Sequence, residues 1–226
     1  MYNSILKDTD RGMVMNEFEN NLPDKINNPY VWEKKNSLSG ELCKKIIKRF
    51  ELDNRYWSDG GVLSNETIIK SNGKITKELN ISCYSQVDNW WKEIDNILNK
   101  KLREELPEYS IRIEKKCNNT ILRTLMDKNL LEDEGYNLQR YIKNKGMYVW
   151  HEDSRPGHHK TRDRLISFIW YLNTVEEGGE TYMYNGKVKP EEGKLLFFPS
   201  SWNYNHKGNI PNSSNKYIIV GMIKHK

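Results

Sequence analysis

Six short β-rich runs follow one another between Tyr136 and Ile223, and they restrict the possible fold more than any other feature of the chain. The runs are YNLQRYI, GMYVW, RLISFIWYLNTV, ETYMY, KLLFFP and KYIIVGMI. Turn signals separate them: Asn-Lys-Gly at 144–146, Gly-Gly at 178–179, Asn-Gly at 185–186 and Gly193. Six such runs in about 90 residues, with no helical period between them, predict a closed or two-layered antiparallel sheet.

The first half of the chain shows helical periodicity instead. Apolar residues recur at helical spacing from Leu42 to Phe50, and Ser39 precedes them as an N-cap. A longer apolar stripe runs from Val87 to Leu106, and Pro107 is expected to end that helix. A further helix is predicted within residues 111–128. We interpret these stripes as faces that pack on a core, because that is their usual role.

Between the helices, residues 54–74 are rich in Gly, Asn and Ser and also contain Tyr56 and Trp57. This composition predicts a flexible loop. The chain shows no internal repeat and no low-complexity linker. We therefore expect a single domain over residues 1–226, with a mainly helical support region at 1–130 and a β core at 136–226.

Composition excludes several classes of protein. A chain of 226 residues buries enough surface to hold a core without a disulfide or structural metal. The three cysteines are odd in number and form no CxxC pair, which indicates reduced thiols. Because no apolar run approaches the roughly 20 residues that span a bilayer, a soluble, cytoplasmic protein without a membrane partner is predicted. The net charge of +5 is spread along the chain and identifies no partner.

The run MYVWHED carries the strongest chemical signal, because His151 and Asp153 lie two residues apart near the end of a predicted strand. Residues i and i+2 of a strand point to the same side of the sheet, so the imidazole and the carboxylate converge. A distant histidine would complete a 2-His-1-carboxylate triad, the donor set of non-haem Fe(II) oxygenases. His206 is the candidate, since it follows the strand that ends near Phe198.

Three other histidines compete with this assignment. His158 and His159 follow an Arg-Pro-Gly turn and have no carboxylate two residues later, so a solvated loop is predicted for them. His225 is the penultimate residue and is expected to be frayed. Lys216 lies ten residues after His206, at the start of the last apolar run. A buried ammonium there would suit the far carboxylate of a metal-bound dicarboxylic acid.

With these motifs in place, residues 136–223 resemble the 2-oxoglutarate- and Fe(II)-dependent dioxygenases, specifically the prolyl 4-hydroxylase branch. YVWHED resembles the family's Y-x-x-H-x-D strand. RLISFIWYLNTVEEGGET resembles its R-x-x-T-x-x-x-Y-L-N…G-G-x-T stretch, and GKLLFFPSSWNYNH resembles the strand and turn that carry the distal histidine. The resemblance implies an α+β, mainly β fold: a double-stranded β-helix (jelly-roll, cupin-like) supported by N-terminal helices.

The resemblance also implies roles for single residues. His151, Asp153 and His206 would ligate Fe(II), and Lys216 would bind the distal carboxylate of 2-oxoglutarate. The resemblance further implies that the cosubstrate is contacted by Thr181, Tyr171 and Tyr141. It implies that the substrate is contacted by Arg164, Tyr148 and Met222. O2 is the second cosubstrate, and ascorbate is included among the candidate cofactors. Plain core packing for Tyr141 and Tyr171, and a solvated strand end for Arg164, stay open as alternatives.

Two positions depart from the branch's pattern. Where collagen-type and algal prolyl 4-hydroxylases usually carry Trp and His after the cosubstrate lysine, this chain has Met222 and Lys224. The prolyl substrate therefore has less support than the metal and cosubstrate machinery. Asp153 itself indicates hydroxylation, because halogenating relatives replace the carboxylate with a small residue.

Three functions follow from the sequence. The first is hydroxylation of a prolyl residue in a peptide or protein, with decarboxylation of 2-oxoglutarate to succinate. The second keeps this chemistry but acts on a nucleobase or a free amino acid. A nucleic-acid substrate, which is not favoured, would need a basic stripe at the site mouth; the candidates for that stripe are Lys143, Lys145, Lys160 and Lys224. The third is a catalytically silent β-barrel binding module, which would be expected to lack a ligand or the lysine.

Overall fold

Two antiparallel sheets form the body of the protein. The computed structural model describes residues 17–64 and 67–226. The major sheet contains, in order, β1 (Trp32–Lys34), β13 (Leu195–Pro199), β10 (Arg164–Tyr171), β15 (Lys216–His225), β8 (Asn137–Tyr141), β6 (Lys77–Asn80) and β2 (Ser58–Asp59), with β7 (Leu131–Asp133) also beside β15. The minor sheet contains β12 (Gly186–Val188), β11 (Thr181–Met183), β14 (His206–Gly208), β9 (Met147–His151) and β5 (Lys74–Ile75). A separate hairpin pairs β3 (Gly61–Ser64) with β4 (Thr67–Lys70).

From β8 onward the chain alternates between the sheets. Strands β8, β10, β13 and β15 belong to the major sheet, and β9, β11, β12 and β14 belong to the minor sheet. Every pairing is antiparallel. The predicted mainly β fold with a double-stranded β-helix core is confirmed, and all six predicted runs contain a strand of this core.

Strand periodicity explains how the major sheet holds two hydrophobic clusters. On β10, Phe168 and Trp170 pack in the cluster shared with the helices, whereas Ile169 and Tyr171 pack in the cluster between the sheets. Such alternation follows from the two-residue period of a strand. Because both faces of this sheet are covered, β10 reads as a continuous apolar run rather than an alternating one.

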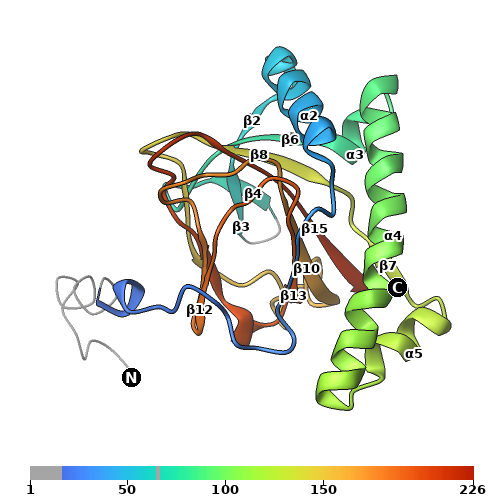
Figure 1. Cartoon of the computed structure of the whole chain (residues 1–226). Helices are drawn as coiled ribbons and strands as arrows, with labels where there is room; N and C mark the ends of the chain where they lie inside the picture. The colour runs from blue at the N-terminus through green and yellow to red at the C-terminus, as the bar shows by residue number, and fades with distance from the viewer. Residues whose placement is uncertain (1–16, 65–66) are drawn as a thin grey trace.

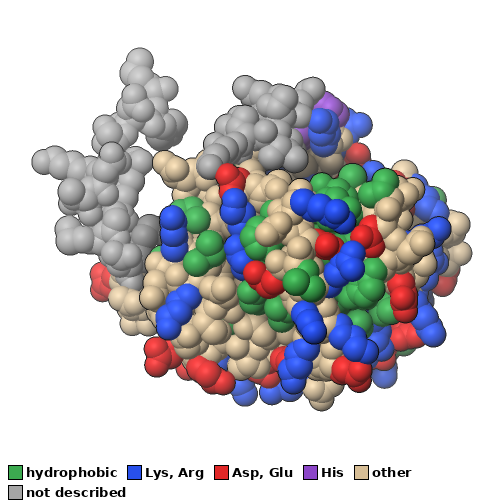
Figure 2. Space-filling model, turned by 90° about the horizontal axis from the view of Figure 1, so that it is seen from above, with side chains coloured by type: hydrophobic (Ala, Val, Ile, Leu, Met, Phe, Trp, Pro, Cys, Tyr) green, Lys and Arg blue, Asp and Glu red, His purple; other side chains and the backbone are tan. Residues whose placement is uncertain are grey.

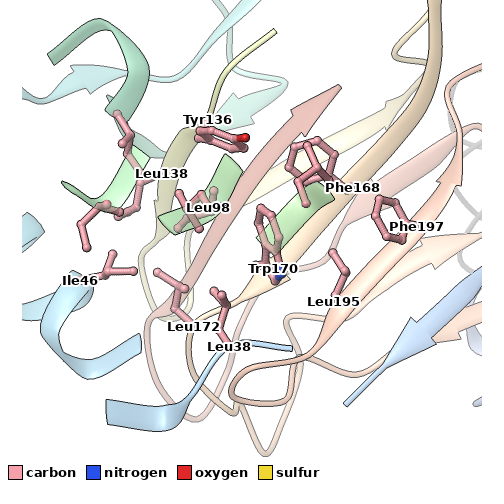
Figure 3. Packing of buried hydrophobic residues seen from close by; sticks show 14 of the residues in the cluster. Leu38, Ile46, Leu98, Tyr136, Leu138, Phe168, Trp170, Leu172, Leu195 and Phe197 are labelled. Carbon is pink, nitrogen blue, oxygen red and sulfur yellow. The ribbon is translucent and has the colours of Figure 1, made fainter. Parts of the chain in front are cut away.

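Four of the helices lie on the outer face of the major sheet (Figure 1). They are α2 (Gly40–Leu52), α3 (Ile81–Tyr84), α4 (Asn89–Cys117) and α5 (Ile121–Asp127). The predicted N-cap of α2 is confirmed, since the Ser39 side chain accepts a hydrogen bond from the Leu42 backbone N–H. Figure 3 shows Ile46 of α2 and Leu98 of α4 packed toward Leu138, Trp170 and the other side chains of the sheet.

The prediction that Pro107 ends the long helix is wrong, because α4 continues to Cys117. Proline removes one hydrogen bond, to the carbonyl of Arg103, and Arg103 is on the exposed side of the helix. Beyond the proline, Tyr109 and Ile113 remain buried, so core packing continues past the defect. The helix ends instead at Asn118, whose φ of 50° is left-handed, and this break divides the helix predicted within 111–128.

The N-terminal half also contains more β structure than predicted. The segment expected to be a loop at 54–74 holds β2, β3 and β4 and the first residue of β5; residues 65–66 lie outside the described part of the chain. Strands β1, β2 and β6 extend the major sheet, and β5 extends the minor one. These strands have two to four residues each, too few to show a period, and only pairing with the C-terminal strands defines them.

Within the described residues, none of the helices combines the length and the apolar character that crossing a bilayer requires. The long α4 carries many charged residues and has the hydropathy of a surface helix.

Gly221 lies where β15 passes closest to its neighbours, and this gives a test of the packing. A Cβ at Gly221 would lie 2.4 Å from Cζ of Phe168 and 2.6 Å from the Gly135 carbonyl oxygen. We expect Gly221→Ala to lower the free energy of unfolding by about 1–3 kcal/mol, as overpacking does. Urea denaturation measures this value. Gly157→Ala is the control, because a Cβ there meets nothing within 4 Å, and an equal loss in both variants would contradict the packing argument.

Candidate metal centre

Two paired strands of the minor sheet bring the predicted ligands together. His151 ends β9, and His206 begins β14, and the two residues are direct cross-strand partners. Their ring centroids lie 4.1 Å apart. Asp153 follows β9 by two residues and reaches both rings, with Oδ1 3.8 Å from Nε2 of His151 and Oδ2 3.6 Å from Nε2 of His206.

The three side chains form a compact donor set. Their potential ligand atoms all lie within 4.8 Å of one another, and no other group of His, Cys, Asp or Glu in the described residues meets this condition. Two imidazole nitrogens and one carboxylate oxygen match the facial triad that suits Fe(II) and leaves positions for cosubstrates. The residues present therefore fit the metal that the sequence predicts.

Backbone carbonyls orient both imidazoles. Nδ1 of His151 lies 2.8 Å from the carbonyl oxygen of Val149, and Nδ1 of His206 lies 3.1 Å from that of Tyr204. A carbonyl only accepts, so each Nδ1 carries the proton and donates it. Each Nε2 is then left as a lone-pair donor directed at Asp153, as a metal site requires.

Burial and repulsion from His206 keep His151 neutral. Burial lowers the pKa of His151 to about 3, and the nearby His206 contributes in the same direction. For Asp153, burial favours the neutral acid, but the two imidazoles and a hydrogen bond from Ser167 outweigh it and lower the pKa. At neutral pH the centre therefore holds an ionised Asp153 and a neutral His151, the forms that bind a dication.

Ser167 and Arg164 support Asp153 from β10. The Ser167 hydroxyl donates to Oδ2 of Asp153 at 2.6 Å, and Arg164 donates to the Asp153 backbone carbonyl at 3.0 Å. Arg164 also forms an ion pair with Glu134 at 2.7 Å. Sequence reasoning missed the role of Ser167, although Ser167 occupies the Thr position of the R-x-x-T pattern. Such supporting contacts fix a ligand's orientation.

Lys216 occupies the other end of the same cavity, which has a volume of about 970 Å³. Its side chain is 1% exposed, and Nζ donates to the Gly179 carbonyl at 2.8 Å. Burial lowers its pKa from 10.5 to about 7. A buried ammonium with a single carbonyl acceptor is well placed to gain a carboxylate partner.

Of the predicted cosubstrate residues, Tyr141 contacts Lys216, and Thr181 and Tyr171 contact each other. Nζ lies 4.1 Å from the centre of the Tyr141 ring, and the Thr181 hydroxyl hydrogen-bonds Tyr171 at 2.7 Å. Tyr141 and Thr181 line the cavity, whereas Tyr171 is fully buried and lies behind Thr181. Gly208 keeps this space open, because a Cβ there would lie 3.1 Å from the Tyr141 ring.

The substrate residues predicted from the sequence also line the cavity: Arg164, Tyr148 and Met222. The Tyr148 ring stacks on His151 with centroids 3.5 Å apart. The cavity has one further polar wall that sequence reasoning missed, formed by Lys74, Glu78 and Gln139. No motif marks these residues, since Lys74 and Glu78 come from short strands of the N-terminal half.

The remaining histidines lie elsewhere. His158 and His159 stack on each other with ring centroids 5.6 Å apart, and neither belongs to the ligand group or to the lining of the cavity. His225 is exposed at the end of β15. The structure thus brings together the three predicted ligands and leaves the competing histidines outside.

Comparison of the sequence with known protein families agrees with this geometry. Residues 136–224 match the sequence model of the 2OG-Fe(II) oxygenase superfamily, which confirms the resemblance seen in the sequence. The search of the curated proteins found no significant match.

Three solved prolyl hydroxylases share this fold. One from Trichoplax adhaerens, in complex with a hypoxia inducible factor oxygen degradation domain peptide fragment, has a TM-score of 0.63 at 18% identity and covers 98% of this chain and 94% of its own. A Pseudomonas putida prolyl-4-hydroxylase has a TM-score of 0.59 at 15% identity, covering 87% and 93%. A viral collagen prolyl hydroxylase from Paramecium Bursaria Chlorella virus-1, in a 2OG complex, has a TM-score of 0.56 at 20% identity, covering 87% and 96%. At these identities the likeness establishes the fold.

Removal of one ligand tests the centre. We expect His206→Ala to weaken Fe(II) or Mn(II) binding by more than about 100-fold, since loss of a supporting contact alone costs 10–100-fold. Calorimetric metal titration measures the affinity, and a thermal melt checks that the variant folds. His225→Ala is the control, because that histidine is exposed and ends a strand of the other sheet, β15. Metal affinity retained in folded His206→Ala would remove His206 from the ligand set.

Proposed function

We propose that this chain, whose residues 136–224 match the sequence model of the 2OG-Fe(II) oxygenase superfamily, is an Fe(II)- and 2-oxoglutarate-dependent dioxygenase that hydroxylates a prolyl residue of a peptide or protein. One observation carries the oxygenase part. A triad of His151, Asp153 and His206 shares a single cavity with a buried lysine, Lys216. The prolyl part is supported by the prolyl hydroxylases that share the fold.

Each group in the cavity has a task in this proposal. His151, Asp153 and His206 hold Fe(II), and Lys216 with Thr181 receives the far carboxylate of 2-oxoglutarate. When bound there, metal and cosubstrate supply the oxidation: one oxygen atom of O2 enters succinate as CO2 leaves, and the other enters a substrate C–H bond. Tyr148 and Met222 flank the target, and the enclosed walls limit access of water.

The chain's own residues also control charge. Asp153 stays ionised at neutral pH, because its pKa is lowered despite burial and the Ser167 hydroxyl donates to the carboxylate. Lys216 gains a proton more readily once a carboxylate lies beside it, so cosubstrate binding restores the charge that burial removes. Both effects favour ordered loading of a dication and a dianion.

A nucleic-acid substrate has less support. Of the four lysines that could form a basic stripe, Lys160 alone lines the cavity, and Lys224 forms an ion pair with Glu132 at 3.1 Å. On the face in Figure 2, basic and acidic side chains are interspersed, not sorted into a stripe. A silent binding module is also disfavoured, because the complete donor set and the buried lysine are both present. Ascorbate as a cofactor and a cytoplasmic location stay predictions.

Anaerobic titration is the direct test of the proposed chemistry. Adding Fe(II) and then 2-oxoglutarate to the protein should produce the weak visible charge-transfer absorption of a chelated cosubstrate. The absorption should be absent in His206→Ala and should need far more 2-oxoglutarate in Lys216→Ala, with the Fe(II) requirement little changed. Folded protein that binds metal but develops no absorption would contradict the oxygenase proposal and favour a binding module.

The pH dependence of cosubstrate binding tests Lys216 separately. Its pKa of about 7 lies below the ordinary 10.5, so the apo protein loses the ammonium as the pH rises above 7. Affinity for 2-oxoglutarate should therefore fall by up to about tenfold per pH unit between pH 7 and 9. Calorimetry with the Mn(II)-loaded protein measures the slope.

Two variants serve as controls for this slope. Lys216→Met should bind weakly with no comparable pH dependence, and Lys100→Met, an exposed residue of α4, should behave as the wild type. A wild-type affinity that does not change between pH 7 and 9 would show that Lys216 does not supply the charge.

A further inference from the structure

A single cross-strand row of the minor sheet connects the two ends of the cavity. Thr181 of β11 pairs with Gly208 of β14, Gly208 pairs with Tyr148 of β9, and Tyr148 pairs with Lys74 of β5. The two histidines belong to the central strands, β9 and β14. The ligand pair therefore lies between Thr181 on one side and Lys74 on the other.

Lys74 is part of a buried polar cluster. Its Nζ forms an ion pair with Oε1 of Glu78 at 2.7 Å and lies 4.8 Å from the centre of the Tyr148 ring. Glu78 also accepts hydrogen bonds from the Thr76 hydroxyl at 2.7 Å and the Asn137 side chain at 2.9 Å. Lys74 and Glu78 are each 9% exposed, and both line the cavity. Charged residues are rarely buried to this degree without a reason in packing or function.

Some N–H hydrogen-bond donors of the cluster remain available to a ligand. Glu78 is satisfied by three donors, whereas the ammonium of Lys74 has three N–H groups and one anionic partner. Beside it, Gln139 accepts from the Tyr141 hydroxyl at 3.2 Å, and its side-chain NH2 has no acceptor within the described part of the chain. The wall thus offers hydrogen-bond donors to a ligand that carries an acceptor.

That ligand is not the cosubstrate. Thr181 is at the β11 end of the row, where Lys216 donates to the nearby Gly179 carbonyl, and the paired ligands His206 and His151 lie farther along the two central strands. Lys74 is three strand spacings from Thr181, or about 14 Å along the sheet. A dicarboxylate held between Lys216 and the triad leaves Lys74 on the far side of Tyr148, where a second molecule would enter.

The charge of the cluster determines which kind of hydrogen-bond acceptor a ligand can place there. Glu78 already neutralises Lys74, so another carboxylate would leave an unbalanced anion in a buried site. A neutral acceptor avoids this cost. On these grounds we infer that Lys74, held by Glu78, is a specificity-determining residue that donates to an amide carbonyl oxygen of a peptide substrate beside its target residue. This inference rests on the proposed oxygenase function.

The test begins with finding a peptide that the enzyme modifies. Pooled synthetic peptides with one fixed central residue (Pro, Asn, Lys or Leu) and randomised flanks are incubated with the enzyme, Fe(II), 2-oxoglutarate and O2. Mass spectrometry detects the gain of one oxygen atom, and succinate formation without peptide is measured in parallel. We expect at least one pool to be oxidised, and members of that pool then serve as substrates.

Variants of the cluster are compared on the selected peptide. Lys74→Met should raise its KM by about 10- to 100-fold, the effect of losing a charge-assisted hydrogen bond, while the Kd of 2-oxoglutarate stays within about twofold. Because this variant leaves a buried carboxylate, the K74M/E78M double variant, which removes both charges, is measured too and should show the same pattern. Lys100→Met is the matched control.

Glu78→Gln separates recognition from structural support. It leaves the ammonium of Lys74 without its counter-charge, so a carboxylate beside the target becomes favourable. We expect the preference between peptides that differ by Asn or Asp next to the target to shift toward Asp by about tenfold or more in this variant. A purely structural cluster would not change charge preference.

Three results would overturn the inference: an unchanged peptide KM in both Lys74 variants, a weakened Kd for 2-oxoglutarate with an unchanged peptide KM, or no oxidised pool although succinate forms. The last result would show that the cavity does not take a peptide, with the oxygenase chemistry intact. Absence of succinate in the wild type would instead count against the proposed function itself, so the two failures are distinguishable.

Discussion

The pairing of β9 with β14 is the contact on which the rest of this site depends. It makes His151 and His206 direct neighbours although they are far apart in the chain. The pairing exists because successive strands alternate between two sheets, which makes β9 and β14 neighbours in the minor sheet. Once the histidines are adjacent, Asp153 needs only its place two residues after β9 to reach both rings. The triad is thus a consequence of strand order, and its precision comes from backbone carbonyls and Ser167.

The buried charges of the cavity work against the stability of the empty protein. Lys216 loses solvation without gaining an anion, and its lowered pKa expresses that cost. Between pH 7 and 10.5 the unfolded chain holds a proton on this lysine that the folded chain releases, so its cost to stability grows as the pH falls toward 7. Asp153 and the Lys74–Glu78 pair are similarly enclosed. A hydrophobic core of large aromatic residues on the other face of the major sheet offsets these costs (Figure 3).

The sequence predicts those parts of the site that local patterns encode. The HxD motif and Lys216 lie in strands or next to strands with a clear apolar signal, and His206 follows the apolar run that ends near Phe198. The structure gathers these residues in one cavity. What the sequence did not predict depends on tertiary contacts. Strand β14 has three residues and no period, and β5 and β6 are defined only by pairing with β9 and β8. The error at Pro107 has the same origin, because packing of Tyr109 and Ile113 outweighs one lost backbone bond.

The polar wall changes how substrate specificity is understood in this cavity. A site that recognised a prolyl ring by packing alone would surround the target with apolar side chains, and Met222 does provide one adaptable apolar contact. The lining, however, also includes Lys74, Glu78 and Gln139. Apolar contact distinguishes substrates weakly, whereas a buried donor left without its acceptor excludes them strongly. Hydrogen bonding to the peptide main chain would therefore position any target residue that the pocket admits, and the shape around Tyr148 and Met222 would then decide which side chain fits.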